Sequence, residues 1–388
     1  MRRIKNTFKE FIENEKTGGL LLILCTIVSL LIANSTIGSH YINLWNIPVG
    51  SHSVVEWIND GLMAIFFFLI GLELVENTKD GDLSDIRSAM LPVSAAIGGM
   101  LVPATIYLSL NWGTATESGA GIPMATDIAF ALGVLSLFGK KVPLSLKIFL
   151  TALAVIDDLG AIIVIAIFYS KELSATFLFG ALGVFALLVT FKLVFKIKNL
   201  IPYLLGGIVM WYLMLHSGIH ATIAGVLLAI TIPYRKGDGR KNPNKVLQHI
   251  LHTPVAFAVL PVFALANTAI RIEGSWDSAL GEPFAQGILL GLIVGKPIGI
   301  GLFSFLTVRM GLCKLPEDIN WTKLFSVSIL GGIGFTMSIF ISLLAFDDQY
   351  HINQSKLMIM LGSLTSGIIG FLVIREVALK KKRLPVTK

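Results

Sequence analysis

The chain has 388 residues, of which 54% are hydrophobic and only 14% are charged. Soluble proteins of this size carry roughly 25% charged residues, so the composition excludes an ordinary soluble domain and indicates a polytopic membrane protein. The formal net charge of +7 is compatible with nucleic-acid binding, but the placement of the basic residues argues against nucleic acid as a partner.

Twelve apolar segments follow one another along the chain and predict about twelve transmembrane helices. They lie near residues 18–33, 58–74, 91–110, 121–138, 146–169, 175–195, 200–215, 219–233, 254–268, 285–306, 324–346 and 357–374. The basic lead before the first segment has no small-residue cleavage site, so we expect a retained span instead of a signal peptide. The connections are brief, and we therefore expect residues 1–388 to form a single all-α integral membrane domain.

Lysine and arginine are distributed unevenly between alternate connections. One set of connections holds only Lys171, Arg271 and Lys356, whereas the other set, which includes both termini, holds all the rest except Lys296. Connections rich in Lys and Arg face the cytoplasm. We therefore expect both termini to be cytoplasmic, and the basic net charge needs no nucleic-acid partner.

The fourth apolar segment combines a helix-breaking sequence with a carboxylate. It opens with Gly119–Pro123, and Thr126 and Asp127 follow soon after. The eleventh segment is interrupted by glycines in Gly331–Gly334. Paired interrupted spans in two halves of a chain indicate a transporter binding site, although for the eleventh segment alone close glycine packing between helices is the simpler interpretation.

The fifth segment carries two adjacent carboxylates, Asp157 and Asp158, in an otherwise apolar run. At ~1.5 Å per residue, Asp157 lies about 15 Å from Lys147 at the cytoplasmic edge, near the middle of a membrane. An ionised Asp at that depth costs about 2.5–3.5 kcal/mol even on a lenient scale. Neighbours on a helix project about 100° apart, so the two cannot both face one partner.

Lys296, in the tenth segment, is the only basic residue well inside an apolar run. It lies at a depth similar to that of Asp157 in a hydrocarbon layer of roughly 30 Å. Opposite charges at one depth offset each other's desolvation if they meet. For a lone Asp–Lys pair, a structural role in helix packing is an equal alternative. Three carboxylates and a lysine together favour a transport site.

Other titratable residues are candidates for a pH response or an access path. Asp60 begins the second segment and Glu73 ends it, His220 lies near the outer face, and His249 and His252 fall in a basic cytoplasmic loop. Histidine titrates near physiological pH, but a solvated or packed side chain is the favoured interpretation of each histidine taken singly, and an ordinary interface residue is the favoured interpretation of Asp60. The histidines lack metal-ligand spacing, and no phosphate-binding or nucleophile motif is present. We therefore expect no enzyme, catalytic residue or cofactor.

Taken together, these motifs resemble the NhaA-type sodium/proton antiporters of bacteria. The resemblance is carried almost end to end by Trp57–Asp60, Phe66-Phe67, Gly71–Glu73, Ala125–Gly133, Ile156–Gly160, Ser217–Thr222, Gly295–Pro297 and Gly332–Phe340. It implies twelve helices, crossed broken helices at the fourth and eleventh spans, and inverted repeats of the third to fifth and tenth to twelfth spans. It also implies electrogenic exchange of more than one proton per Na⁺ or Li⁺ across the inner membrane.

The resemblance also implies roles for individual residues. Asp157 and Asp158 correspond to the pair that binds the transported ion and protons. Thr126 and Asp127 correspond to the helix crossing, and Lys296 to the lysine that pairs with the first aspartate. By the same motifs, Glu73 matches the family's cytoplasmic funnel, Asp60 its outer side and His220 its pH response.

The match departs from the family pattern at three places. Val75-Glu76-Asn77 follows Gly71–Glu73 where the family has a basic residue and then glutamate, and Gln248 replaces a glutamate before His249. Both changes affect residues tied to steep pH activation. The outer connection 35–56 is short where relatives extend a β-hairpin that builds the dimer, so a homodimer is left open.

Two other functions remain open from the residues alone. A sodium-coupled solute symporter would need a pocket for an organic substrate. An intramembrane aspartyl protease would need two separated aspartates that converge on a peptide bond, which the adjacent pair and the lysine fit poorly.

Overall fold

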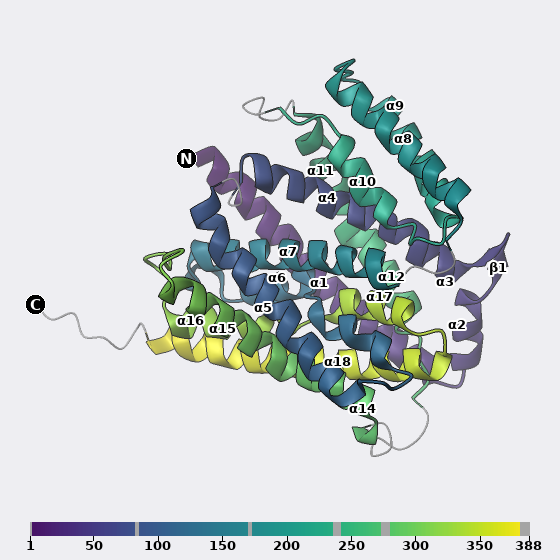
Figure 1. The fold of residues 1–388 in the computed structure, drawn as a ribbon. Helices are drawn as coiled ribbons and strands as arrows, with labels where there is room; N and C mark the ends of the chain where they lie inside the picture. The colour runs from purple at the N-terminus through teal and green to yellow at the C-terminus, as the bar shows by residue number, and fades with distance from the viewer. Residues whose placement is uncertain (1, 82–84, 170–172, 236–241, 273–279, 381–388) are drawn as a thin grey trace, which may run out of the picture. The chain divides into compact units, whose positions relative to one another are not determined.

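The computed structural model describes residues 2–81, 85–169, 173–235, 242–272 and 280–380, nearly all of them helical (Figure 1). Eight helices in these ranges are long and apolar enough to cross a membrane. A ninth span results if α16 (Trp321–Leu330) and α17 (Phe335–Ala345), bent by 50° at a short break, count as one. Thr17–Ala33 and Ile201–Leu215 are shorter apolar helices. The chain is therefore an all-α polytopic membrane protein.

Contacts divide the chain into two compact units. The first comprises residues 1–20, 85–161 and 273–388, and the second comprises residues 21–84 and 162–272. The first unit holds part of α1 (Arg2–Ala33), α5 (Ile86–Asn111), the 3₁₀ helices η2 (Glu117–Met124) and η3 (Gly139–Lys141), α6 (Ile128–Ser136), most of α7 (Leu144–Phe168), α14 (Pro283–Leu290), the π-helical turn η6 (Gly291–Gly295), α15 (Lys296–Arg309), α16, α17 and α18 (Gln349–Lys380).

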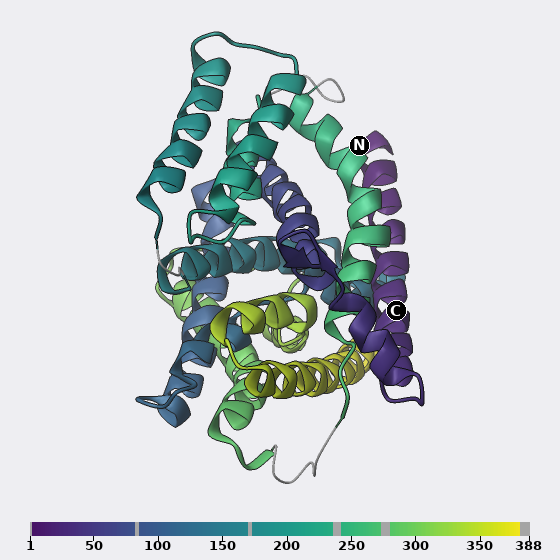
Figure 2. The ribbon, with the colours of Figure 1, turned by 90° about the vertical axis from the view of Figure 1, so that its right-hand side faces the viewer.

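The second unit is built mainly from long apolar helices. Its elements are the rest of α1 and α7, α2 (Gly38–Trp45), β1 (Pro48–Val49), β2 (His52–Ser53), α3 (Val54–Trp57), the π-helical turn η1 (Ile58–Leu62), α4 (Met63–Lys79), α8 (Ala175–Leu193), α9 (Ile201–Leu215), α10 (Ile223–Thr231), α11 (Pro243–Pro254), the π-helical turn η5 (Val255–Val259) and α12 (Leu260–Asn267). The helices α8 and α9 pack against each other, as Figure 2 shows in teal. Leu72, Tyr203 and Met210 belong to the buried core of this unit.

Within the first unit, α5 and α15 pack along each other at very close range. At their closest approach, Gly98 faces Gly299, and a Cβ on either residue would overlap the backbone carbonyl of the other. Small residues at such a contact let two membrane helices approach closely, because there is little hydrophobic driving force between helices in lipid. This contact fixes α15, whose first residue is Lys296.

Both interrupted segments of the first unit break where the sequence contains glycine or proline. In the fourth segment the 3₁₀ helix η2, which contains Pro123, gives way to extended backbone before α6. In the eleventh segment the backbone turns between α16 and α17 at Gly331–Gly334. A Cβ at Gly332 would overlap the carbonyl oxygen of Leu292, so this position accepts only glycine.

Two details of the sequence-based expectation were wrong. His249 and His252 lie on the helix α11 and not in a loop, because the helix that contains the ninth apolar segment begins at Pro243, well before the apolar run. Lys356, assigned to an outer connection, lies inside α18 and is buried. In both cases polar residues lower the local hydropathy although the helix continues.

The short outer connection 35–56 nevertheless contains a β-hairpin. Its two strands pair in antiparallel fashion, Pro48 with Ser53 and Val49 with His52. Trp57 Nε1 donates a hydrogen bond of 2.8 Å to the carbonyl of Val49. The hairpin is therefore attached to the start of the second span, although it is only two residues long on each side.

The close contact between α5 and α15 generates a stability prediction. We expect Gly299→Ala to lower the stability of the protein by about 1–3 kcal/mol, because the added methyl group overpacks a backbone contact. Gly183→Ala on α8 is the matched control, because a Cβ there would meet nothing within 4 Å. Thermal unfolding of the purified proteins in detergent tests this, and equal unfolding temperatures for the two variants would contradict it.

Candidate functional site

Three polar side chains, those of Lys296, Asp157 and Thr126, meet inside the first unit. All three residues are 0% exposed. Lys296 Nζ donates hydrogen bonds to Asp157 Oδ2 and, at 2.8 Å, to Thr126 Oγ1. Thr126 Oγ1 also lies 2.8 Å from Asp157 Oδ2. The lysine and the aspartate thus form a buried ion pair that a hydroxyl group bridges.

The three residues come from three differently shaped segments. Asp157 lies in the middle of the regular helix α7, which its long apolar run favours. Lys296 begins α15 directly after the π-helical turn η6, a distortion that is frequent at functional sites. Thr126 lies in the extended backbone between η2 and α6.

Hydrogen bonds join the two interrupted segments at their breaks. The Asp127 amide donates to the carbonyl of Ile333 at 2.6 Å, and Ser338 Oγ donates to the carbonyl of Ile122 at 2.7 Å. Thr126 Oγ1 is 2.9 Å from the carbonyl oxygen of Gly331. Because a hydroxyl has one proton, it is donated either to this carbonyl or to Asp157. The second break therefore contacts the Lys296–Asp157 pair through Thr126.

Asp127 lies at the start of two helices. Its Oδ1 accepts a hydrogen bond of 2.9 Å from the amide of Phe130 at the N-terminus of α6. Its Oδ2 accepts hydrogen bonds from the amide and the hydroxyl of Thr336 at the N-terminus of α17. The N-terminus of a helix carries a partial positive charge, so a carboxylate is stabilised there. Asp127 is therefore held by the helix ends and is separate from the lysine pair.

Asp158 is fully buried beside Asp157 on α7. Successive residues of a helix differ by about 100° in direction, so the two carboxylates do not share one set of partners. Asp157 Oδ1 accepts no hydrogen bond from the described residues. In the same ranges no three His, Cys, Asp or Glu side chains converge as metal ligands. A cation at the Asp157–Asp158 pair would therefore complete its shell with hydroxyl, carbonyl or water oxygens.

His220 and Asp60 meet in the second unit, near the hairpin. His220 Nδ1 is 3.6 Å from Asp60 Oδ1, and both side chains are about four-fifths buried. The backbone carbonyl of Asp60 accepts a hydrogen bond of 3.0 Å from Trp211 Nε1. The structure thus brings together two residues that are 160 positions apart in the sequence.

Glu73 lies elsewhere in the second unit, where α4 packs against α11. The side-chain amides of Asn244 and Gln248 both donate to the carbonyl of Leu72, at 3.2 and 3.1 Å. Lys245 Nζ forms an ion pair of 2.8 Å with Glu76. Thirteen residues of helix separate Glu73 from Asp60, about 20 Å, so these candidate residues form two groups. His249 on α11 is exposed, and His252 is half-buried.

Thr336 and Ser338 belong to the motifs that carry the family resemblance, but the sequence pattern assigned no role to either residue. Both hydroxyl groups bond across the two breaks, to Asp127 and to Ile122. A signal was present, because Thr336 follows a glycine-rich break just as Thr126 follows Gly119–Pro123. Its partner could not be read from the sequence, since the two residues are 209 positions apart.

Known proteins resemble this chain over almost its whole length. The family model described as Na⁺/H⁺ antiporter 1 matches residues 9–374. A protein named Na⁺/H⁺ antiporter NhaA from Flavobacterium psychrophilum is 58% identical over 97% of this chain and 97% of its own length. Proteins of that name from Cytophaga hutchinsonii and Dechloromonas aromatica are 57% and 56% identical, over 95% of this chain and 95% and 96% of their own lengths. The chain therefore belongs to the NhaA family of Na⁺/H⁺ antiporters.

Proposed function

We propose that this protein exports Na⁺ or Li⁺ across the bacterial inner membrane in electrogenic exchange for H⁺. The observation that carries the proposal is the buried cluster of Lys296, Thr126 and Asp157 with Asp158 beside it. Intramembrane ionisable groups at one depth are a functional site by default. The names of the relatives supply Na⁺ and H⁺ as the transported ions, and Li⁺ is added from the family resemblance.

Competition for carboxylate oxygens is the proposed chemistry. A carboxylate withdrawn from water is costly to leave uncompensated, so each site must take up a proton, a cation or a charged partner. Asp158 is the leading sodium ligand, and Asp157 is either paired with Lys296 or released from it. Lys296 and Na⁺ are both cations, so an ion bound at Asp157 competes with the lysine for that carboxylate.

Charge counting supports electrogenic transport. The two carboxylates Asp157 and Asp158 can carry two protons in one direction, whereas the site carries a single Na⁺ in the other. One turnover of this kind moves one net positive charge across the membrane. The membrane potential therefore drives sodium export, at roughly 2.3 kcal/mol per charge for each 100 mV.

Alternating access is proposed to act on the two breaks. Thr126 and Asp127 connect the fourth and eleventh segments to each other and to the pair on α7 and α15. We propose that these segments are crossing discontinuous helices within inverted repeats, as the family resemblance implies. A shift of α6 or α17 would then change which side of the membrane reaches Asp158.

The proposal includes twelve transmembrane spans, a cytoplasmic location for both termini and a possible homodimer. Twelve spans result from the nine long spans, the two shorter apolar helices and α10. The distribution of Lys and Arg places both termini in the cytoplasm, and residues 1–388 would act as one transporter domain in contact with membrane lipid. The hairpin 48–53 offers a site for a homodimer.

A pH response is proposed for the two groups in the second unit. Asp60 and His220 would act near the outer face, and Glu73, His249 and His252 near the cytoplasmic face. The observations that support it are the His220–Asp60 contact and the polar bonds around Leu72. An aspartyl protease is disfavoured, because both oxygens of Asp127 are held by helix N-termini.

Removal of the charge at Asp158 tests the proposed ligand. We expect Asp158→Asn to lower sodium-driven proton movement in everted vesicles at least about tenfold, because a carboxylate interaction of about 1.5–3 kcal/mol is lost. Asp348→Asn is the matched control, since the Asp348 side chain is 61% exposed and lies outside the site. Full activity of the Asp158 variant would sink the assignment.

Two substitutions at Thr126 distinguish the contribution of its hydroxyl group from that of its side-chain size. Thr126→Val leaves the buried partners Lys296 and Asp157 without the bridging oxygen, so we expect a loss of about 1–3 kcal/mol in stability and reduced antiport. Thr126→Ser retains the hydroxyl and should restore most of both. If valine and serine behave alike in thermal unfolding and transport, the bridge has no role.

Competition between ions predicts a pH dependence with a definite sign. Protons occupy the carboxylates more fully as the pH falls, so the apparent KM for Na⁺ should rise, by up to about tenfold per pH unit for each competing proton. The maximal rate extrapolated to saturating Na⁺ should change less. Initial rates measured at several Na⁺ concentrations between pH 6 and 9 test this, and a KM independent of pH would refute competition.

A further inference from the structure

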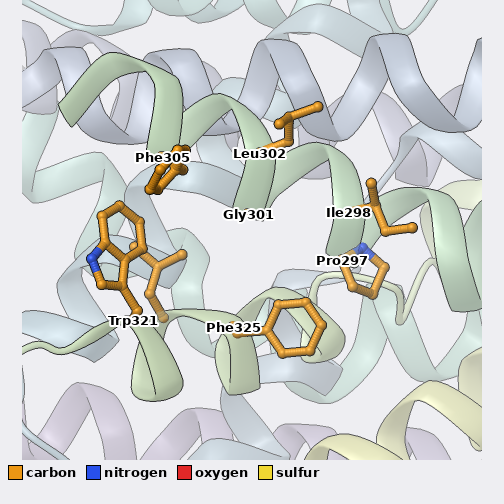
Figure 3. Close-up of a pocket in the computed structure, with 8 residues that line it drawn as sticks. Pro297, Ile298, Gly301, Leu302, Phe305, Trp321 and Phe325 are labelled. Carbon is orange, nitrogen blue, oxygen red and sulfur yellow. The ribbon is translucent and has the colours of Figure 1, made fainter. Parts of the chain in front are cut away.

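An apolar groove opens on the surface of the first unit between α15 and α16. Pro297, Ile298, Gly301, Leu302 and Phe305 line it from α15, and Trp321, Leu324 and Phe325 from α16 (Figure 3). Its volume is about 380 Å³, within the roughly 300–1,000 Å³ typical of small-molecule sites. Ile298, Leu302, Phe305 and Phe325 are each close to half exposed, so the groove faces outward and not into the ion site.

We propose that this groove binds one acyl chain of an anionic phospholipid of the cytoplasmic leaflet, with the phosphate held by Arg309 and Lys314. The proposal does not depend on antiport. It depends only on the predicted orientation, in which the connection between α15 and α16 is cytoplasmic.

The length of the groove fits one leaflet. Pro297 directly follows Lys296, which lies near the middle of the membrane by its depth in the tenth span. Phe305 is eight residues further along α15, about 12 Å at the helical rise. The hydrocarbon half of a bilayer is about 15 Å thick. The groove therefore runs from the midplane almost to the cytoplasmic headgroup region.

The cytoplasmic end of the groove has the residues of a membrane interface. The rings of Phe305 and Trp321 meet edge to face, with centroids 5.4 Å apart. Tryptophan is enriched at headgroup level, where its ring is in hydrocarbon and its N–H can reach polar groups. Trp321 is 39% exposed, so its ring is accessible to a bound lipid.

Positive charge continues the apolar stripe. One face of α15 carries a line of apolar residues that ends in a cation, at spacings of four, three and four residues: Ile298, Leu302, Phe305 and Arg309. Residues three and four apart are neighbours on a helix surface. Arg309 and Lys314 are exposed, and neither forms an ion pair with another described residue. Arginine and lysine both bind phosphate, arginine through two parallel hydrogen bonds.

The other charges of this connection leave the two cations available. Lys323 Nζ donates to the carbonyl of Asp318, and the Asp318 carboxylate accepts a hydrogen bond of 2.6 Å from Ser145. Glu317 is an exposed carboxylate. The connection therefore holds three cations, Arg309, Lys314 and Lys323, and two carboxylates. This excess of positive charge favours an anionic headgroup over a zwitterionic one.

Lipids with brominated acyl chains test the groove, because bromine quenches tryptophan fluorescence at short range. The full-length protein is reconstituted with brominated phosphatidylglycerol or brominated phosphatidylcholine, and the contribution of Trp321 is obtained by subtracting the Trp321→Phe variant. Each cation near a membrane contributes about 1 kcal/mol to anionic-lipid binding. Arg309 and Lys314 together therefore contribute about 2 kcal/mol, and we expect half-maximal quenching of Trp321 at an anionic-lipid fraction about 30-fold lower than the zwitterionic fraction.

Two variants locate the binding. Gly301→Leu fills the groove, since even a Cβ there lies 3.6 Å from the Phe325 ring. It should abolish both the quenching of Trp321 by bound lipid and the preference for the anionic lipid. Arg309→Gln leaves the apolar lining intact and removes one of the two cations, so it should lower the preference for the anionic lipid about fivefold without weakening quenching by the zwitterionic lipid. Gly183→Leu, at an exposed glycine of α8 with open space around it, and Lys198→Gln, at an exposed lysine, are matched controls that should change neither.

Equal quenching by both lipids in the unmodified protein would show ordinary solvating lipid and overturn the proposal. A preference that is unchanged in both Gly301→Leu and Arg309→Gln would place the lipid elsewhere and overturn the proposal as well.

Discussion

Lys296 and Asp157 are opposite charges that meet where neither is exposed to water. Removing each ion from water costs several kcal/mol, and the attraction between them offsets this cost only if further hydrogen bonds complete their shells. Thr126 supplies such a bond to both partners. The ion pair therefore requires a backbone that can bring Thr126 from the fourth segment to α7 and α15.

The two helix interruptions meet that requirement. An intact helix uses its amide and carbonyl groups internally, whereas a broken one leaves polar groups at the break. Here the groups left by the fourth segment bond to those left by the eleventh, through Asp127, Ile333 and Gly331. Asp127 stabilises the positive ends of two helices. Lys296 donates a hydrogen bond to Thr126, whose hydroxyl lies 2.9 Å from the carbonyl oxygen of Gly331 at the end of α16. The charged side chains thus compensate the polar backbone groups that the two helix breaks leave unpaired. A cation that enters the site changes the net charge there and therefore the stability of this arrangement.

Much of this site could be predicted from the sequence, because charges inside apolar segments stand out and the helical rise gives their depth. That reasoning predicted that Asp157 and Lys296 lie at the same depth in the membrane. It also predicted that the side chains of Asp157 and Asp158 point in different directions. It could not identify Thr336 as the partner of Asp127, because such a contact depends on the path of two breaks far apart in the chain. The same limit applied to Lys356 and to the start of α11. Apolar runs identify where a helix can be in lipid, but polar residues extend a helix wherever other helices cover them.

Proton release on sodium binding is a direct test of competition between Na⁺ and H⁺ for Asp157 and Asp158. The purified protein in weakly buffered detergent solution receives NaCl, and a pH-sensitive dye records the protons set free, while calorimetry records sodium binding. If Na⁺ and H⁺ compete, bound Na⁺ releases protons, choline chloride releases none, and Asp158→Asn abolishes the release. Sodium binding by the unmodified protein without any proton release would contradict it.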